Sequence, residues 1–382
     1  MKVGFYSPLP PARTGVADYS AALLRALAPL GDVEVNARDA EIALYHLGNN
    51  RLHREIYERA MERPGVAVLH DAVLHHFYLD ALNAQEYIAE FTYNYGAWTE
   101  DLARGLWQRC AISGADPDYF LYPMLKRVAE RSLGIIVHNP RAAAMVREHA
   151  PQAAVYEIPH LFAPPAELAP EAEVIRWRAA HGVAPRTLLA GVFGYLRESK
   201  RLASVLRALG RARAASEIAL LVAGDFVSSD LERAMKPLLS SDAAVIRIGY
   251  VSEREFWVHA AAVDACINLR YPMAGETSGI GIRLMGIGKP VLVTAGEETG
   301  RYPGAACLRV DPGPAEEEML AEYLVWLARY PDDARAVGER ARRHIREFHS
   351  PERAAALYWQ ALADCYDRTN LNRAAGNSAV VR

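Results

Sequence analysis

The chain has 382 residues, a hydrophobic content of 51% and a formal net charge of −3 at pH 7. This length exceeds the roughly 250 to 300 residues at which a single hydrophobic core usually divides, so we expect two domains. The charge excludes the basic footprint of a nucleic-acid-binding protein, and the apolar runs are shorter than the roughly 20 residues that a bilayer-spanning helix needs. Because the chain opens on a strand pattern and not on a signal peptide, we expect a cytoplasmic protein with at most peripheral membrane contact.

Strand and helix patterns alternate along the first half of the chain. Apolar runs predict strands at residues 2–6, 42–46, 66–69, 134–138 and 155–158, and helical spacing predicts helices at 16–27 and 51–62. Alternation of this kind predicts a parallel sheet whose faces are covered by helices.

Residues 85–132 break this alternation with helical sequence that is rich in aromatic residues, and we interpret them as an insertion in the first domain. The rings belong to Phe91, Tyr93, Tyr95, Trp98, Trp107, Tyr119, Phe120 and Tyr122. They could form the core of a helical subdomain, or they could form a wall that binds an acceptor, because aromatic faces suit sugars and lipids. Of these two interpretations we favour the core.

A segment with four prolines at residues 159–170 indicates a linker between the two halves. Beyond it the alternation restarts, with strands predicted at 187–193, 218–223, 244–248, 264–269, 290–294 and 307–310. Three helical stretches close the chain, the last at 351–366. We therefore predict a first domain at 1–165, completed by the helix at 351–366, and a second domain at 171–350.

The stretch 263–295 is the most informative part of the sequence. An apolar run at 265–269 predicts a buried parallel strand, and a glycine-containing loop leads from it into a helix that ends near Ile287. Glu276 therefore lies just beyond the carboxyl end of a strand, where open α/β sheets bind ligands, and the N–H groups of the following helix attract anions. A carboxylate beside an anion site predicts a ligand with both hydroxyls and phosphate, as in a nucleotide sugar.

A second strand end, at residues 194–201, carries the positive charges of Arg197, Lys200 and Arg201. Taken alone, this segment could be a solvated basic turn capped by Ser199. Because it also joins a strand end to a helix start, its charges lie where helix N–H groups already attract anions. Together with the acidic loop described above, it favours binding of a diphosphate.

The first domain offers two further segments that could face a ligand. A loop at 8–20 joins the first strand to its helix, and Gly15 would let the backbone approach a ligand closely, with a tight turn as the alternative. His70 and Asp71 follow the strand at 66–69, so they lie at the ligand-binding edge of the sheet. A histidine there can donate to a sugar hydroxyl or share developing positive charge through its carbonyl, and Asp71 can orient it.

Signatures of other cofactors and of metals are weak. The sequence GIGKP is not a P-loop, because Arg283 stands where that motif has its first glycine and Pro290 stands where it has Ser or Thr. The dinucleotide-binding pattern G-x-G-x-x-G does not follow the first strand either. A D-x-D pattern at 116–118 matches metal-dependent transferases, but its position after Ser113-Gly114 favours a cap or turn. The four cysteines form no C-x-x-C pair. We predict no bound metal and no cofactor besides a nucleotide-sugar substrate.

In this order the motifs resemble those of retaining glycosyltransferases with the GT-B fold, and in particular glycosyltransferase family 4. The resemblance covers residues 1–366 and rests on PLPPARTGVADYS, LHD at 69–71, IPH at 158–160, the Lys200 loop, GYVSEREF and GETSGIGIRLMGIGKPVLV. It implies an α/β chain with two Rossmann-like domains facing a central cleft. The acceptor would lie mainly on the first domain and the nucleotide sugar on the second, and the C-terminal helix would cross back to the first.

The resemblance also implies roles for individual residues. Arg197 and Lys200 would hold the diphosphate, Tyr250 and Val251 would meet the base, and Glu276 would bind sugar hydroxyls. N–H groups of residues 278–280 would approach the sugar and phosphates, while Gly15 and His70 would close the site from the first domain. The predicted catalytic residues are His70, Asp71, Lys200 and Glu276. The predicted donor-binding residues are Gly15, Gly194, Arg197, Lys200, Tyr250, Val251, Glu276, Thr277, Ser278, Gly279, Ile280 and Arg283.

Two positions depart from the family pattern. The family usually has two glutamates separated by seven residues, the second of which grips the ribose, whereas here Glu276 is followed after six residues by Arg283. Arginine accepts no hydrogen bonds, so it does not provide that contact with ribose. The arginine that usually follows the glycine of the phosphate loop is replaced by Tyr195, which leaves Arg197 as the expected substitute.

These observations predict transfer of a sugar from a nucleoside diphosphate donor to an acceptor hydroxyl with retention of configuration, in the synthesis of a polysaccharide, glycolipid or glycoconjugate. The acceptor could be a glycan, a lipid-linked sugar or a small molecule. Two alternatives stay open at this point. One is a nucleotide-sugar epimerase or a phosphorylase with the GT-B fold, and the other is a catalytically silent nucleotide-sugar-binding protein.

Overall fold

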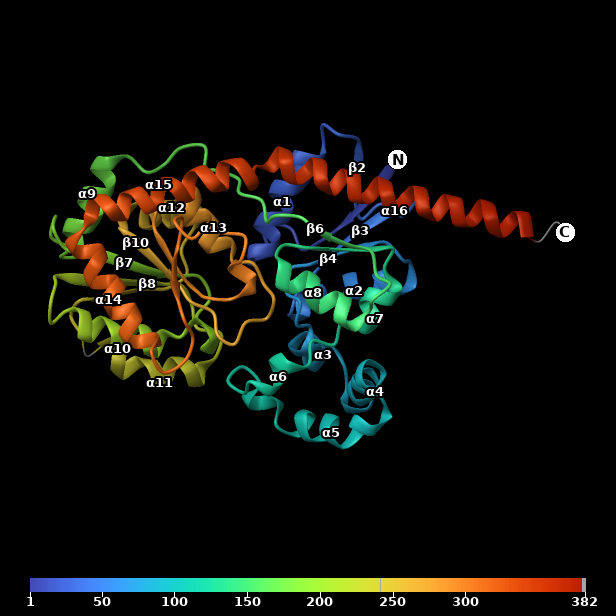
Figure 1. Cartoon of the computed structure of the whole chain (residues 1–382), viewed down its shortest axis with the longest axis horizontal. Helices are drawn as coiled ribbons and strands as arrows, with labels where there is room; N and C mark the ends of the chain where they lie inside the picture. The colour runs from blue at the N-terminus through green and yellow to red at the C-terminus, as the bar shows by residue number, and fades with distance from the viewer. Residues whose placement is uncertain (241, 380–382) are drawn as a thin grey trace. The chain divides into compact units, whose positions relative to one another are not determined.

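The computed structural model describes residues 1–240 and 242–379, which form two compact units (Figure 1). The first unit comprises Met1–Leu161, Met273–Thr277 and His349–Arg382. The second comprises Phe162–Pro272 and Ser278–Phe348. The division at Leu161 falls inside the segment predicted as a linker, and the short loop Met273–Thr277 groups with the first unit.

The first unit is built on a parallel sheet with the strand order β2-β1-β3-β4-β5-β6. Its strands are β1 (Lys2–Tyr6), β2 (Asp32–Val35), β3 (Ile42–Leu47), β4 (Val66–Leu69), β5 (Gly134–Val137) and β6 (Val155–Glu157). The register pairs Leu47 with Leu69, so β3 and β4 end side by side. The five strands predicted for this half are confirmed. Sequence analysis missed β2, a partly exposed edge strand without the continuous apolar run of a buried parallel strand.

The helices of the first unit are α1 (Gly15–Leu27), α2 (Arg54–Glu62), α3 (His75–Ala81), α4 (Ala84–Tyr95), α5 (Glu100–Gln108), α6 (Asp118–Leu121), α7 (Lys126–Arg131) and α8 (Pro140–His149), with the short 3₁₀ helix η1 (Arg51–His53) before α2. Short polar side chains cap α1, α4 and α8 among them. Thr14 caps α1, and Asn139 caps α8 by accepting from the N–H of Ala142 at 2.8 Å. Both caps follow a strand, so each helix starts at the carboxyl edge of the sheet.

The aromatic insertion is largely a helical core, as favoured from sequence. Tyr87, Phe91 and Tyr119 are fully buried in one cluster with the helices α3 to α7, which lie together in Figure 1. Trp98 differs, because 83% of its surface is exposed. The D-x-D pattern is a turn, in which the Oδ1 of Asp116 accepts from the N–H of Asp118 at 3.0 Å.

The C-terminal helix α16 (Pro351–Ala379) belongs to the first unit, which confirms the predicted return of the chain. It packs along α1, where the hydroxyls of Tyr19 and Tyr358 lie 2.8 Å apart (Figure 1). The helix continues beyond the predicted end at residue 366. There the guanidinium of Arg368 donates to the hydroxyl of Tyr156 at 3.0 Å, and this contact with β6 supports the extra turns.

The second unit is built on a parallel sheet with the order β12-β11-β10-β7-β8-β9. Its strands are β7 (Leu188–Phe193), β8 (Ile218–Ala223), β9 (Val245–Ile248), β10 (Ala265–Asn268), β11 (Val291–Thr294) and β12 (Leu308–Val310). All six predicted strands of this half are confirmed. Side chains alternate between two cores, with Leu189 in one and Leu188 and Ala190 in the other, because successive residues of a strand face opposite sides.

Helices cover both faces of the second sheet (Figure 1). They are α9 (Glu171–Ala180), α10 (Leu202–Ala212), α11 (Ser229–Ser240), α12 (Glu253–Ala262), α13 (Gly279–Gly286), α14 (Glu316–Arg329) and α15 (Pro331–Phe348), with the 3₁₀ helices η4 (Glu198–Lys200) and η5 (Glu297–Thr299). The helices α10 and α14 pack on one core, and α12, α13 and α15 pack on the other. Within the described residues, no helix has the length and apolar character to cross a membrane.

Candidate functional site

His70 lies at the carboxyl edge of the first sheet, directly after β4. Its backbone N–H donates to the carbonyl of Leu47 at 2.9 Å, which joins the ends of β4 and β3. The residue is partly exposed, and its Nε2 lies 3.0 Å from the Nδ1 of His46 in β3. We expected Asp71 to orient this ring. Instead, Asp71 Oδ2 accepts from the N–H of Asn49 at 2.9 Å and fixes the loop after β3, while His46 contacts the ring.

Four histidines and a tyrosine form a cluster of rings beside β4, which we call the histidine cluster. It comprises Tyr19, His46, His70, His138 and His160, with neighbouring ring centroids 4.6–6.1 Å apart. Burial lowers the pKa of His46, His70 and His160 well below the usual range, and it lowers the pKa of His138 to about 4. The rings are therefore neutral at pH 7. Sequence analysis missed this cluster because its members come from α1, from β3 and from the segments after β4, β5 and β6, which are far apart in sequence.

The loop Met273–Thr277 is fastened to the same edge of the first sheet. The N–H of Ala72 donates to the carbonyl of Ala274 at 2.9 Å, and Nδ2 of Asn139 donates to the carbonyl of Gly275 at 2.8 Å and to Oγ1 of Thr277 at 3.0 Å. Glu276 is partly exposed, and its carboxylate accepts from the N–H of Ala274 at 2.7 Å. This hydrogen bond holds the side chain of Glu276 against the backbone of its own loop. The structure thus brings Glu276 to the sheet edge that also carries His70.

Gly15 begins α1 at this edge. A Cβ added to Gly15 would meet no other part of the described chain within 4 Å apart from its sequence neighbours and its own helix, so the space at that Cβ position is open. No packing inside the protein requires glycine there. The predicted close approach of a ligand to this backbone stays a prediction.

In the second unit, the structure brings two predicted motifs together around Gly194. This residue follows β7 with a φ of 82°, and a Cβ built on it would lie 3.8 Å from Lys200 Nζ and 3.6 Å from the side chain of Ile280. Lys200 is 6% exposed, and its Nζ donates to the carbonyl of Phe193 at the end of β7. The ammonium of Lys200 and the first turn of α13 therefore both lie beside Gly194.

The two arginines near Lys200 differ in their surroundings. Arg197 is exposed and stands before η4 with an extended backbone. Arg201 has a φ of 58°, and its guanidinium forms a forked ion pair with Glu316 of α14, with both Nε and Nη2 2.9 Å from Oε1. Glu316 is 1% exposed, so Arg201 neutralises a buried carboxylate. The ion pair gives Arg201 a structural role, and the expected contribution of its charge to the phosphate loop stays a prediction.

The ends of β7, β8 and β9 are joined by close backbone contacts. Gly224 has a φ of 135°, and a Cβ there would lie 2.3 Å from the carbonyl oxygen of Gly194, so only glycine fits. The next residue, Asp225, accepts from the N–H of Tyr250 through Oδ1 at 3.0 Å. Tyr250 is 51% exposed, and Val251 is partly buried. Asp225 was missed from sequence, although its position after a strand and a glycine was a usable signal.

The start of α13 is capped by Ser278. Its Oγ accepts from the N–H of Gly281 at 3.3 Å and donates to Oδ1 of Asn268 at 3.0 Å. The first N–H groups of a helix have no partner within the helix, so those of Gly279 and Ile280 are suited to an anion. Ile280 lies beside Gly194, so this helix start is close to the loop that Lys200 also contacts.

Arg283, further along α13, packs against α12. Its guanidinium forms an ion pair with Glu253 and lies over the rings of Phe256 and Trp257, at 3.9 and 4.4 Å from their centroids. These contacts account for an arginine at this position through packing. The predicted contact of Arg283 with the donor stays a prediction.

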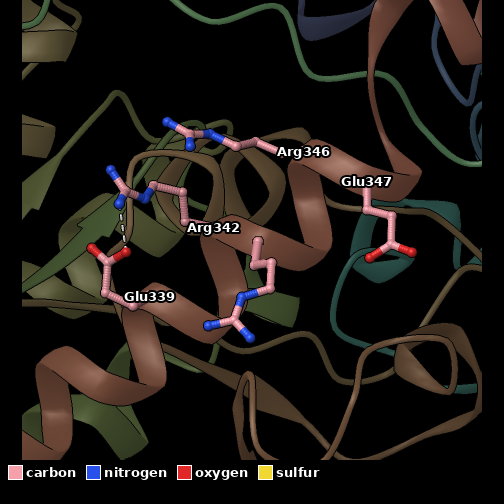
Figure 2. A pocket seen from close by; sticks show the side chains of 5 residues that line it. Glu339, Arg342, Arg346 and Glu347 are labelled. Carbon is pink, nitrogen blue, oxygen red and sulfur yellow. Dashed lines mark hydrogen bonds and ion pairs between the residues drawn. The ribbon is translucent and has the colours of Figure 1, made fainter.

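A hollow of about 500 Å³ lies elsewhere in the second unit, along α15 (Figure 2). Glu339, Arg342, Arg343, Arg346 and Glu347 line it, and Arg342 donates to Glu339 at 2.5 Å. None of the predicted site residues lines this hollow. Across the described part of the chain, no three His, Cys, Asp or Glu side chains are arranged to hold a metal ion.

No family model and no curated protein sequence matches the chain. Solved structures do match it. HepE from Anabaena in complex with UDP and glucose is 14% identical, with a TM-score of 0.69 over 95% of this chain and 100% of HepE. Sucrose-phosphate synthase from Thermosynechococcus elongatus is 15% identical, with a TM-score of 0.65 over 96% of this chain and 100% of the synthase.

WaaG, a glycosyltransferase involved in lipopolysaccharide biosynthesis, is 16% identical, with a TM-score of 0.58 over 92% of this chain and 98% of WaaG. Similarity at this level of identity concerns the fold. The likeness runs over nearly the whole length of each chain, and it includes both sheets. The protein therefore has the GT-B fold, as the order of its motifs predicted.

Proposed function

We propose that this protein is a glycosyltransferase that moves a sugar from a nucleoside diphosphate sugar to an acceptor hydroxyl with retention of configuration. One observation carries the proposal: the Gly194 loop, the buried ammonium of Lys200 and the first turn of α13 meet at the carboxyl edge of the second sheet. That combination suits a diphosphate. It occurs in a fold shared with HepE, whose structures include complexes with UDP and with UDP-glucose.

The diphosphate would be held by charge and by backbone donors. The hydrogen bond from Lys200 to the carbonyl of Phe193 orients the ammonium beside the Gly194 loop, where its positive charge would attract phosphate oxygens. Arg197, exposed beside the loop, would add a second positive charge. The N–H groups of Gly279 and Ile280 would complete the anion site.

The sugar would be recognised by Glu276 and His70, which share an edge of the first sheet. A carboxylate accepts from two adjacent hydroxyls, and a neutral imidazole offers one donor or one acceptor. Tyr250 and Val251 follow β9, and we assign them to the base. Since HepE binds UDP, uridine is the first base to test.

The reaction would proceed by displacement on one face of the sugar. A double displacement needs a nucleophilic carboxylate about 5 Å from a second carboxyl. Asp71, the other carboxylate predicted as catalytic, accepts from the N–H of Asn49, and we do not assign it as a nucleophile. The leaving diphosphate, stabilised by Lys200 and the helix N–H groups, would accept the proton of the acceptor hydroxyl. No metal is invoked in this step.

The test combines donor binding with turnover. Isothermal titration of UDP and other nucleoside diphosphates should identify a nucleotide that binds, and incubation of the matching sugar donors with an acceptor panel should release that nucleotide. Lys200→Ala should lower kcat by about 100-fold or more, because it removes a donor to the developing charge. Lys236→Ala, on the exposed face of α11, is the matched control.

Each outcome separates the rival activities. Proton NMR of the product should show the anomeric configuration of the donor, and inversion would refute the mechanism. Isomerisation of donor without acceptor would identify an epimerase. Binding of a nucleotide sugar without turnover across the panel would identify a silent binding protein. Unchanged turnover in Lys200→Ala would overturn the assignment of the phosphate site.

A further inference from the structure

We infer that His46 is a positioning residue that holds His70 in the tautomer with its proton on Nδ1. His70 then presents an N–H donor, and not a basic lone pair, to a ligand at this edge of the first sheet. The identity of that ligand as a sugar hydroxyl rests on the proposed function. The tautomer itself does not.

The two rings are joined by a single hydrogen bond. Nδ1 of His46 lies 3.0 Å from Nε2 of His70, and the ring centroids are 5.3 Å apart. A neutral imidazole carries one proton, so one of these nitrogens donates and the other accepts. Which of them donates determines the tautomers of both rings.

The other nitrogen of His46 decides between the two arrangements. His46 is fully buried in β3, and its Nε2 has no hydrogen-bond partner within the described chain. If His70 donated, His46 would carry its proton on Nε2, as a buried N–H without an acceptor. Such orphan N–H groups are rare in proteins, and an unpaired acceptor is tolerated more often. His46 therefore donates from Nδ1, and its bare Nε2 faces the core.

Two neighbouring histidines already have this arrangement. Nδ1 of His53 lies 2.9 Å from the carbonyl oxygen of His46, and Nδ1 of His138 lies 2.9 Å from that of Ile158. A carbonyl oxygen only accepts, so both Nδ1 atoms carry the proton. The Nε2 atoms of both rings are buried without a partner in the described residues, as in His46. An unpaired Nε2 lone pair is thus the arrangement that this part of the core accommodates.

Charge does not alter this conclusion at neutral pH. Burial lowers the pKa of both His46 and His70 well below the usual range, so each ring carries one proton. The groups that face the pair are Tyr19 from α1, Tyr358 from α16, and the rings of His53, His138 and His160. These neighbours are neutral at pH 7 and leave both rings uncharged.

The consequence for His70 follows from its two nitrogens. Because Nε2 accepts from His46, the proton of His70 is on Nδ1, for which the described chain offers no hydrogen-bond partner. The side chain is partly exposed, so this N–H can donate to an oxygen of a bound ligand. His70 would then hold a hydroxyl oxygen in place, and it would not act as a general base.

The tautomer is measured directly by nitrogen NMR of the full chain labelled with ¹⁵N-histidine, in which the two ring nitrogens of each tautomer have distinct shifts. His70→Asn identifies the signals of His70 by their loss. We expect an Nδ1–H tautomer for His70 in the unmodified protein. An Nε2–H tautomer there would overturn the inference, whether or not the His46 variants fold.

Variants at His46 test the cause. His46→Asn keeps a donor near the position of Nδ1 and should preserve the tautomer, whereas His46→Asp offers only an acceptor and should move the His70 proton to Nε2 or charge the ring. An unchanged His70 signal in His46→Asp would refute the role of His46. His75→Gln, which keeps the hydrogen bond of a buried histidine to Tyr87, is the control for general effects on packing.

Donor kinetics then connect the tautomer with the proposed function. His46→Asp should raise KM for the sugar donor about 2- to 10-fold, the value of one hydrogen bond, with the affinity for free nucleotide unchanged. His46→Asn should stay close to the unmodified protein. An equal loss of nucleotide affinity would indicate a purely structural role. If no donor is turned over, the proposed function fails while the NMR result still decides the tautomer.

Discussion

Acid should destabilise the first unit through its buried histidines, and His53 and His138 give this effect a magnitude. His53 is fully buried and His138 is 7% exposed, and burial lowers the pKa of each to about 4. In the unfolded chain both rings titrate near pH 6.5. Between pH 6.5 and 4 the unfolded chain binds protons that the folded chain does not. The contribution to the free energy of unfolding is therefore complete above pH 6.5 and is lost as the pH falls.

The size of the loss follows from the two pKa values of each ring. One pKa unit corresponds to about 1.36 kcal/mol, and a ring whose pKa falls from 6.5 to about 4 should cost about 2 kcal/mol between pH 7.5 and pH 5. Two such rings cost about 4 kcal/mol together. This is a large part of the roughly 5 to 15 kcal/mol by which folded proteins are stable.

The effect is measured by urea unfolding at pH 7.5 and at pH 5. Hydrogen exchange of the amides in β3 and β5 serves as the probe, because these strands belong to the first unit. The variants His53→Asn and His138→Asn keep a donor for the same carbonyl but do not titrate, so each should reduce the acid-induced loss by about 2 kcal/mol. His181→Asn, at an exposed position on the second unit, is the control. If the two variants lost as much stability in acid as the unmodified chain, the reasoning would be refuted.

Three further outcomes are expected. Arg201→Met should lower the free energy of unfolding of the second unit by about 3–5 kcal/mol in urea titrations, because it leaves the buried carboxylate of Glu316 without its charge partner; a change below 1 kcal/mol would contradict this. Gly224→Ala should weaken nucleotide binding in calorimetry, because the new Cβ would lie 2.3 Å from the carbonyl oxygen of Gly194 and would push the Gly194 loop out of place. Unchanged affinity would exclude that loop from the site. Trp98→Ala, at a position 83% exposed, should leave the melting temperature unchanged. A higher KM for the acceptor in that variant would revive the interpretation of the insertion as an acceptor-binding wall.

The strands could be predicted because parallel strands covered on both faces have continuous apolar runs. The six residues of β8 and the six of β3 are all buried, and each run is visible in the sequence. The edge strand β2 is different, since its burial alternates between exposed and partly buried positions over four residues. Its sequence, DVEV, is too short and too polar to be distinguished from a loop.

Local motifs also identified the residues around Gly194, because the loop and the helix start that follow a strand are contiguous in sequence. The partners of those motifs could not be identified in this way. His46 and His70 are 24 residues apart, and Asp225 and Tyr250 are 25 apart. Each pair is formed by the register of two strands, and a single sequence does not give the atoms that such a register aligns.

The adjacent cations Lys200 and Arg201 show how far local reasoning extends. Both follow the same strand and carry the same charge, yet η4 ends between them and Arg201 adopts a φ of 58°, so the two side chains reach different partners. The compact ammonium of Lys200 fits beneath the Gly194 loop, whereas the planar fork of Arg201 matches the buried carboxylate of Glu316, 115 residues away. Charge alone predicted a phosphate contact for both residues. The shape of each cation and the position of a distant carboxylate place Lys200 beside the Gly194 loop and Arg201 in an ion pair with Glu316, so the proposed phosphate contact rests on Lys200.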